Sequence, residues 1–248
     1  MAILIPRYAR EPFDPKRRSL LVAALEAGVF GATALPLTAT PAAAAVLGNN
    51  PGRLPPGRSI YTLEGSATIN GADASLDSAI KPGDTVETAR DSRLIFVDRG
   101  NAHILRANSR VSLPPANDTA NVLRVFTGVL LSVFGRRKRR LVTAAATIGI
   151  RGTGVYIESD PEESYICTCY GTADLMPFES ELVEETVFSE HHDEPRYAVR
   201  DGGSGKRFRR APFKDHTDLE LALIEGLVGR SPPFSFMLDQ FDSPAGSY

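Results

Sequence analysis

Two cysteines separated by one residue are the only thiols of this chain, and they lie in a run typical of a β-strand. Within the extended run Tyr165–Tyr170, period-two alternation places Tyr165, Cys167 and Cys169 on one face and Tyr170 on the other. Same-face neighbours stand about 6–7 Å apart, whereas a disulfide needs Cβ atoms about 3.8 Å apart, so an intrastrand disulfide would be strained. Two thiolates can instead bind one metal ion, each at about 2.3 Å.

Three of the four histidines lie downstream, inside or beside an acidic stretch of the chain. They are His191, His192 and His216, and the last directly precedes Thr217–Glu220, a capping-box pattern that predicts the start of a helix. A helix N-terminus disfavours imidazolium, so a neutral His216 is suited to metal binding. Both cysteines with two of these three histidines would form a Cys₂His₂ set for Zn²⁺ or Cu⁺, although the spacing is not that of a zinc finger.

Other interpretations of the same residues remain open. The cysteines are equally typical of small buried side chains or of an oxidised pair, and the two adjacent histidines followed by Asp193 are typical of a solvated loop. A nucleophilic Cys169 activated by His191 is a third alternative, but thiols near many carboxylates are expected to have raised pKa values. The sequence holds no Gly-x-Ser-x-Gly, His-Glu-x-x-His or phosphate-loop motif, so we expect no enzyme and assign no catalytic residue.

Charge is segregated along a chain that is nearly neutral as a whole. The 248 residues carry a net charge of −2 with a pI near 6.1, which argues against a globally cationic nucleic-acid binder. Residues 158–195 contain 12 acidic and no basic side chains. A basic run, Arg136, Arg137, Lys138, Arg139 and Arg140, precedes them. This run is either a solvated hairpin loop or a docking site for an acidic partner, for lipid phosphate or for the chain's own acidic stretch.

Short alternating runs separated by turn residues fill most of the chain and predict strands. Their spacing of about 8–12 residues indicates an all-β fold, a rolled or sandwiched sheet of many short strands, with one short C-terminal helix at about 217–228 that packs through Leu219, Leu223 and Leu227. Asn70-Gly71, Pro82-Gly83-Asp84, Arg99-Gly100-Asn101 and Thr127-Gly128 are the expected turns. The predicted strands are Ser59–Leu63, Ser66–Asn70, Asp84–Thr88, Arg93–Phe96, Ala102–Leu105, Arg110–Leu113, Asn121–Phe126, Val129–Phe134, Arg140–Ala144, Gly154–Ser159, Tyr165–Tyr170, Asp174–Met176 and Val183–Phe188.

The first 45 residues have the pattern of an export signal. A charged segment ending in Lys16-Arg17-Arg18 precedes an apolar run and then a small-residue segment, Thr40–Ala45. The paired arginines resemble a twin-arginine signal, with the general secretory route as the alternative. Glu26 interrupts the apolar run, which favours a cleaved leader over a transmembrane anchor because spanning needs about 20 apolar residues. We expect a periplasmic protein with peripheral or no membrane contact, in which residues 46–58 form a linker.

Several short motifs downstream of the linker occur in the order found in a known family. The most specific is Ile150–Tyr156 (IRGTGVY), an Arg-Gly-Thr followed by a strand and then by Cys167–Gly171. On these motifs, residues 59–176 resemble the FecR-like periplasmic domain family, which leaves 177–248 as a C-terminal extension. The other matching motifs are Gly65–Gly71, Ile80–Thr88, Ser92–Leu94, Leu105–Val111, Leu123–Gly128 and Leu141–Thr143.

The resemblance implies an all-β envelope module. The best-known members relay a signal from an outer-membrane transporter to an inner-membrane regulator, and they carry a cytoplasmic anti-sigma region before a transmembrane helix. Only 18 residues precede the apolar segment here, too few for such a region. We therefore expect a non-enzymatic interaction or signal-relay module that binds an envelope protein or ligand, not nucleic acid, through the basic run and Arg151. The alternative is a periplasmic metal-binding or metal-sensing protein that uses the Cys-x-Cys and histidine site.

Overall fold

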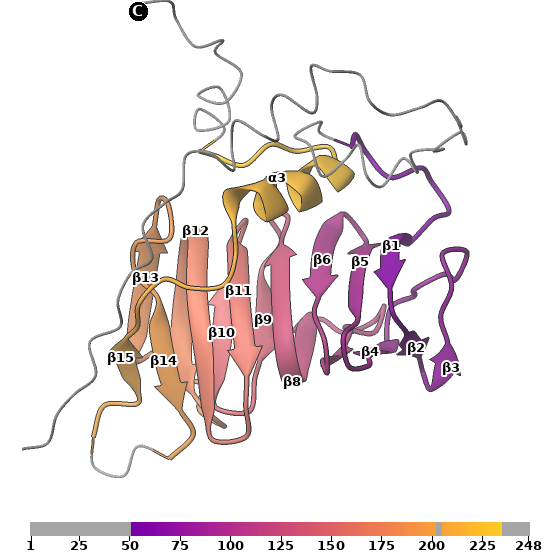
Figure 1. Cartoon of the computed structure of the whole chain (residues 1–248). Helices are drawn as coiled ribbons and strands as arrows, with labels where there is room; N and C mark the ends of the chain where they lie inside the picture. The colour runs from indigo at the N-terminus through magenta and orange to yellow at the C-terminus, as the bar shows by residue number, and fades with distance from the viewer. Residues whose placement is uncertain (1–50, 202–204, 235–248) are drawn as a thin grey trace, which may run out of the picture. The chain divides into compact units, whose positions relative to one another are not determined.

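The computed structural model describes residues 51–201 and 205–234, all of which belong to one compact unit. The predicted export signal at 1–45 lies outside these residues. The described chain is all-β with one short C-terminal helix, which confirms the predicted fold class (Figure 1). The strands are β1 (Ile60–Glu64), β2 (Ala67–Ile69), β3 (Ala72–Asp73), β4 (Thr85–Thr88), β5 (Arg93–Asp98), β6 (Asn101–Leu105), β7 (Arg110–Ser112), β8 (Val122–Val133), β9 (Arg139–Val142), β10 (Ala146–Ile150), β11 (Gly154–Ser159), β12 (Glu163–Pro177), β13 (Glu185–Ser189), β14 (Arg196–Val199) and β15 (Phe208–Arg210), and the helix is α3 (Asp218–Leu227).

The strands form two sheets that share two long strands. Sheet A has the order β1-β5-β6-β8-β11-β12-β14-β15, and sheet B has the order β3-β2-β4-β7-β8-β9-β10-β12-β13. Among these pairs only β8 and β9 run parallel. Because β8 and β12 pass from one sheet to the other, they fix how the two sheets sit against each other.

A glycine with positive φ stands at each point where a long strand changes sheets. Gly128 (φ 84°) divides β8, and Gly171 (φ 92°) divides β12. A Cβ at Gly128 would come within 2.5 Å of the Cα of Ser109, and one at Gly171 within 3.1 Å of the carbonyl oxygen of Gly152. Glycine is therefore required at these corners by both conformation and space. The expected turn at Thr127-Gly128 is wrong: the chain bends there without ending the strand.

The central strands of sheet A are buried on both faces. On β5, Leu94 and Phe96 point into the core between the sheets, whereas Ile95 belongs to a second apolar cluster on the outer face. On β8 the same alternation places Leu130 in the core between the sheets and Leu131 in the outer cluster. A strand covered on both faces reads as a continuous hydrophobic run, as these two do.

The outer face of sheet A is covered by α3, which packs against β8 and β6 (Figure 1). Thr217 caps the helix: its hydroxyl accepts from the Glu220 N–H, and the Glu220 carboxylate accepts from the Thr217 N–H, as the capping box predicts. Of the three leucines predicted to pack, Leu227 is buried and Leu223 packs against the outer cluster, but Leu219 is 54% exposed. The helix buries Leu221, Ile224, Glu225, Gly226 and Leu227.

Segments missed or divided in the sequence prediction fall mainly in the second half. The predicted runs Tyr165–Tyr170 and Asp174–Met176 are parts of the single strand β12. The residues expected as an extension beyond 176 continue the same two sheets as β13, β14 and β15, and β14 and β15 had no predicted counterpart. Within the described ranges, none of the helices has the length and apolar character needed to cross a bilayer.

His103 on β6 is fully buried in the core between the sheets. Its Nδ1 lies 2.7 Å from the Ser132 Oγ, its Nε2 has no hydrogen-bond partner, and its ring packs beside Phe96 and Phe134. Burial, with a contribution from the positive charge of Arg139, lowers the pKa of His103 to about 3. The ring is therefore a neutral core residue at physiological pH.

This burial predicts an acid-sensitive fold. Between pH 6.5 and pH 3, His103 is protonated in the unfolded chain but stays neutral in the folded chain. The free energy of unfolding therefore falls as the pH drops from 6.5 toward 3. At pH 5 the loss from this residue is about 2 kcal/mol, at 1.36 kcal/mol per pH unit. Urea unfolding of the wild type and of His103→Leu, at pH 7 and pH 5, should show a smaller loss in the variant. Equal losses would contradict this account of His103.

Candidate metal centre

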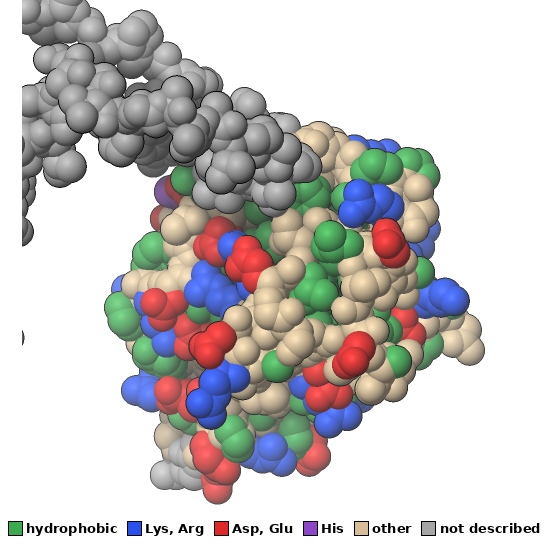
Figure 2. All heavy atoms as spheres, turned by 45° about the vertical axis from the view of Figure 1, so that its right-hand side comes forward, with side chains coloured by type: hydrophobic (Ala, Val, Ile, Leu, Met, Phe, Trp, Pro, Cys, Tyr) green, Lys and Arg blue, Asp and Glu red, His purple; other side chains and the backbone are tan. Residues whose placement is uncertain are grey.

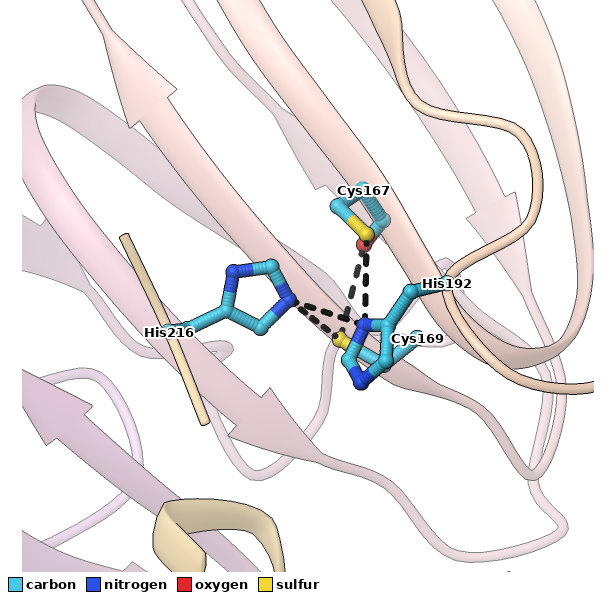
Figure 3. Close-up of side chains that lie close together, drawn as sticks. All are labelled: Cys167, Cys169, His192 and His216. Carbon is cyan, nitrogen blue, oxygen red and sulfur yellow. Dashed lines mark hydrogen bonds between the residues drawn. The ribbon is translucent and has the colours of Figure 1, made fainter. Parts of the chain in front are cut away.

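Four side chains from three separate segments of the chain converge on the outer face of sheet A (Figure 3). They are Cys167, Cys169, His192 and His216, and their donor atoms all lie within 4.8 Å of one another. The Cys167 Sγ lies 3.6 Å from the His192 Nδ1, and the Cys169 Sγ lies 3.4 Å from the His216 Nε2. The two histidine nitrogens lie 3.0 Å apart. One donor set of two sulfurs and two nitrogens is thereby formed from three segments of chain.

These separations are close to those of a tetrahedral metal site. In a tetrahedron with bonds of about 2.3 Å to sulfur and about 2.0 Å to nitrogen, neighbouring S and N atoms stand about 3.5 Å apart and two nitrogens about 3.3 Å apart. The two S–N distances match this within 0.1 Å. The N–N distance needs to open by about 0.3 Å, a small rotation of either ring.

The two thiols are positioned by strand β12. Cys167 and Cys169 share the outer face with Tyr165, whereas Ile166 points into the core between the sheets, as predicted from alternation. Tyr170 does not follow the prediction, since it lies with the cysteines in the outer cluster. The register with β11 passes from Thr168 to Tyr170 and skips Cys169, so a bulge turns Tyr170 toward the thiol face.

His192 is brought over the thiols by the turn that connects β13 to β14. Its backbone has φ 57°, which is uncommon for a residue other than glycine, and its N–H donates to the Cys169 carbonyl oxygen (2.9 Å). The carboxylate of Asp193 holds this turn by accepting from the N–H groups of Glu190 (2.8 Å) and His191 (3.1 Å). This left-handed turn conformation directs the imidazole of His192 toward the two sulfurs.

His216 reaches the thiols from the side opposite the His192 turn (Figure 3). Its ring stacks on Tyr156 of β11, with centroids 4.3 Å apart and planes inclined by 9°, and only 4% of the residue is exposed. Its Nδ1 donates to the Lys214 carbonyl oxygen (2.8 Å). The Lys214 ammonium pairs with Glu158 (2.6 Å), which also accepts from the Tyr156 hydroxyl (2.8 Å), so this segment is fixed to β11.

The partners of the outer ring nitrogens fix where the protons lie. The Lys214 carbonyl can only accept, so the His216 Nδ1 carries the hydrogen and its Nε2 is a bare lone pair. The Asp218 carboxylate lies 3.1 Å from the His192 Nε2, which leaves the His192 Nδ1 bare in the neutral ring. The two bare nitrogens then face each other at 3.0 Å, each also within reach of a thiol, and a proton or a metal ion between them would relieve the repulsion of their lone pairs.

Without a metal ion, the four groups share protons unequally. Hydrogen bonds from the Cys169 thiol and from the two histidines lower the pKa of Cys167 to about 4, against the effect of burial. Burial and the neighbouring Cys167 raise the pKa of Cys169. Burial acts to lower the pKa of His192, but hydrogen bonds to Cys167 and Asp218 outweigh it and the pKa is raised. The expectation that both thiols have raised pKa values is wrong for Cys167.

A catalytic cysteine would need access to a substrate. Cys169 meets His216 and not His191, whereas Cys167 meets His192, which is oriented in turn by Asp218. This sequence of groups matches a nucleophile, a base and an orienting acid. Both cysteines are free thiols and are fully buried, however, so Cys167 is not accessible to a substrate in this structure.

The predicted partner-binding residues do not form one surface. Arg139 is buried beside Phe134, Arg140 pairs with Glu181 (3.0 Å), and only Arg136, Arg137 and Lys138 of the run are exposed. Arg151 is also exposed, on the turn whose Gly152 N–H donates to the Gly135 carbonyl oxygen (3.1 Å). The acidic stretch draws most of its partners from the segment 196–214, in the ion pairs Glu158–Lys214, Glu163–Arg209, Glu185–Arg196, Glu194–Arg196 and Glu194–Arg210.

Two residues of the site escaped the sequence analysis. Tyr156 gave no signal, because its stacking on His216 depends on the pairing of β11 with β12. Asp218 was visible only as an acidic residue in the first turn of the predicted helix. Its position two residues after His216 could have suggested a role beside that histidine.

Comparisons with known proteins give a distant likeness only. No family model and no curated protein matches the chain. Two crystal structures of a candidate anti-sigma factor from Parabacteroides distasonis ATCC 8503 match with a TM-score of 0.42 and 12% identity. Each match covers 51% of this chain and 58% of the other, so the chain spans less than two thirds of that protein. At this level the likeness carries no argument about function.

The division of the basic run into buried and exposed residues can be tested by stability. Burial lowers the pKa of Arg139 to about 10, and the charge of Asp98 opposes this shift. Arg139→Ala should lower the free energy of unfolding by about 2 kcal/mol, because it empties a packed site and leaves a buried carboxylate with less compensation. Arg137→Ala, the matched control on the exposed turn, should stay within about 0.5 kcal/mol of the wild type. Urea unfolding that ranks the two variants equally would contradict the described burial.

Proposed function

We propose that this chain is a non-enzymatic metal-binding protein that holds one Zn²⁺ or Cu⁺ ion through Cys167, Cys169, His192 and His216. The proposal is carried by one observation, the two imidazole nitrogens that face each other at 3.0 Å with their outer nitrogens committed to acceptors. Two sulfurs complete the set, and soft thiolate with imidazole favours Zn²⁺ or Cu⁺ over Mg²⁺ or Ca²⁺.

The number of ligands favours holding or sensing a metal over catalysis. Four protein donors fill a tetrahedral ion, whereas catalytic zinc sites keep one position open for water or substrate. The two cysteines and His216 are buried, and the side chain of His192 is 7% exposed, so the centre is enclosed. An ion at this place would contact three segments at once, namely strand β12, the turn before β14 and the segment before α3. Metal binding should therefore be coupled to the order of the C-terminal part of the fold.

A second candidate function is the interaction module of the FecR-like type, which we propose to act in the periplasm. The exposed cations Arg136, Arg137 and Lys138 lie on a turn joined to the turn of Arg151, and no Asp or Glu of the described residues forms an ion pair with them. On the face that Figure 2 presents, positive and negative side chains lie close to one another. A photo-crosslinking residue introduced at Arg137 should give a discrete protein adduct in intact cells. The same residue at exposed Asp77, the control, should give none. The absence of an adduct at both positions would exclude this surface as a partner-binding site.

The metal proposal predicts a change of thermal stability that needs both cysteines. With free Zn²⁺ at about 100 times the dissociation constant, the bound ion adds about 2.7 kcal/mol. For a chain of this size that amounts to about 5–10 °C in melting temperature. The variant Cys167→Ser/Cys169→Ser should melt lower by at least this amount with Zn²⁺ present, measured by differential scanning fluorimetry under reducing conditions.

A chelator supplies the control for this experiment. It should lower the melting temperature of the wild type by about 5–10 °C more than that of the double variant, because the variant lacks the ion that the two thiols hold. The exposed variant Leu182→Ser, which changes a residue far from the thiols in sequence and not in their cluster, should respond to chelator as the wild type does. Additive effects of chelator and double substitution, or protein that takes up no Zn²⁺ or Cu⁺ after reduction, would refute the proposal.

A further inference from the structure

A second group of metal-binding side chains lies on the solvent side of His192. The His191 Nε2 lies 3.0 Å from both oxygens of Asp218, and the His192 Nε2 lies 3.1 Å from the Oδ1 of the same carboxylate. The three donor atoms lie within 4.8 Å of one another. His192 therefore faces the cysteines with one ring nitrogen and this outer group with the other.

The outer group is open where the inner one is closed. The side chains of His191 and Asp218 are 31% and 30% exposed, against 7% for His192. A surface hollow of about 480 Å³ begins at these residues and is lined by His191, His192, Phe213, His216, Thr217 and Asp218. Water or a small anion has room to complete the coordination of an ion held here.

Both imidazole rings meet the carboxylate of Asp218. The Nε2–H of His191 is shared between its two oxygens at 3.0 Å each, a bifurcated hydrogen bond, whereas a cation placed between the groups can contact all three side chains. Within residues 51–201 and 205–234, no Lys or Arg pairs with Asp218, whose ionic partners are the two imidazoles. Around an ion with bonds of about 2.0–2.2 Å, donor atoms stand about 3.3–3.5 Å apart. The three donor groups need to move apart by about 0.4 Å to reach that spacing.

We infer that His191, Asp218 and the outer nitrogen of His192 form a second, open cation site that shares the His192 ring with the Cys₂His₂ centre. Two nitrogens and a carboxylate suit a divalent ion of borderline softness, Zn²⁺, Co²⁺, Ni²⁺ or Cu²⁺, and not Cu⁺. When both sites are filled, the second ion replaces the hydrogen on the His192 Nε2, and that proton passes to solvent. The shared use of His192 rests on the proposed function, but the ligands His191 and Asp218 belong to the outer site alone.

The test is the number of Zn²⁺ ions bound per chain. Chelator-stripped, reduced protein is titrated with Zn²⁺ and analysed by native mass spectrometry and calorimetry. We expect the wild type to bind two ions. His191→Ala should bind one, namely the ion with the higher affinity of the two. The control Glu190→Gln, which removes an exposed carboxylate beside the site but no ligand, should bind two. Circular dichroism of each variant checks that it is folded.

The cysteine variant separates failure of this inference from failure of the proposed function. A wild type that binds one ion, with His191→Ala unchanged and Cys167→Ser/Cys169→Ser binding none, overturns the outer site and leaves the Cys₂His₂ centre standing. One ion that is lost in His191→Ala but kept in the cysteine variant supports the outer site and overturns the inner one. Two ions in both the wild type and His191→Ala would assign the second ion to other residues and overturn the inference.

Discussion

Two imidazole nitrogens that face each other at 3.0 Å, each with its ring hydrogen committed elsewhere, repel unless a positive charge lies between them. The rest of the candidate site follows from this constraint. A proton can take this place if Cys167 gives it up and becomes a thiolate. The pKa of His192 is accordingly raised and that of Cys167 is lowered. A metal ion satisfies the constraint better, because it also neutralises the sulfurs and uses all four donors. Structural zinc sites contribute apparent binding free energies on the order of 10 kcal/mol, which is comparable to the whole stability of a domain.

The fold supplies this arrangement through strands that serve two sheets. Strand β12 carries the thiols while it lies in sheet A and then turns at Gly171 into sheet B, where it pairs with β13. The same turn of direction brings the segment after β13 back over the outer face of sheet A, so that the N–H of His192 meets the Cys169 carbonyl oxygen. On the other side, α3 is fixed to the sheet by Glu220, which pairs with Arg93 and Arg106 (both 3.1 Å), and His216 lies just before its cap. A closed centre therefore depends on pairings between residues that are about 25 to 50 positions apart.

The sequence was sufficient for the residue types of this site and for most of its elements. Alternation placed Cys167 and Cys169 on one face, and the capping box located α3, because both patterns are local. Which two of the three histidines join the thiols was not predictable, since it depends on the left-handed backbone of His192 and on the stacking of His216 on Tyr156. The sequence pattern predicts a turn at Gly128 and gives no signal at Gly171, although both are bends within a strand. A glycine with positive φ is equally suited to a hairpin turn and to a strand bend, so the pattern cannot distinguish them. Arg139 and Arg140 are likewise indistinguishable in sequence from the exposed cations beside them. Tertiary packing buries Arg139 and pairs Arg140 with Glu181.

The identity of the atoms around a bound ion is the central claim, and X-ray absorption spectroscopy of the zinc-loaded protein measures it directly. The protein is loaded with one equivalent of Zn²⁺ so that the tighter site is filled first. The account predicts a first shell of two sulfurs at about 2.3 Å and two nitrogens at about 2.0–2.1 Å, with the outer-ring scattering of imidazole. A first shell of oxygen and nitrogen without sulfur would contradict it, because the ion would then be bound away from Cys167 and Cys169.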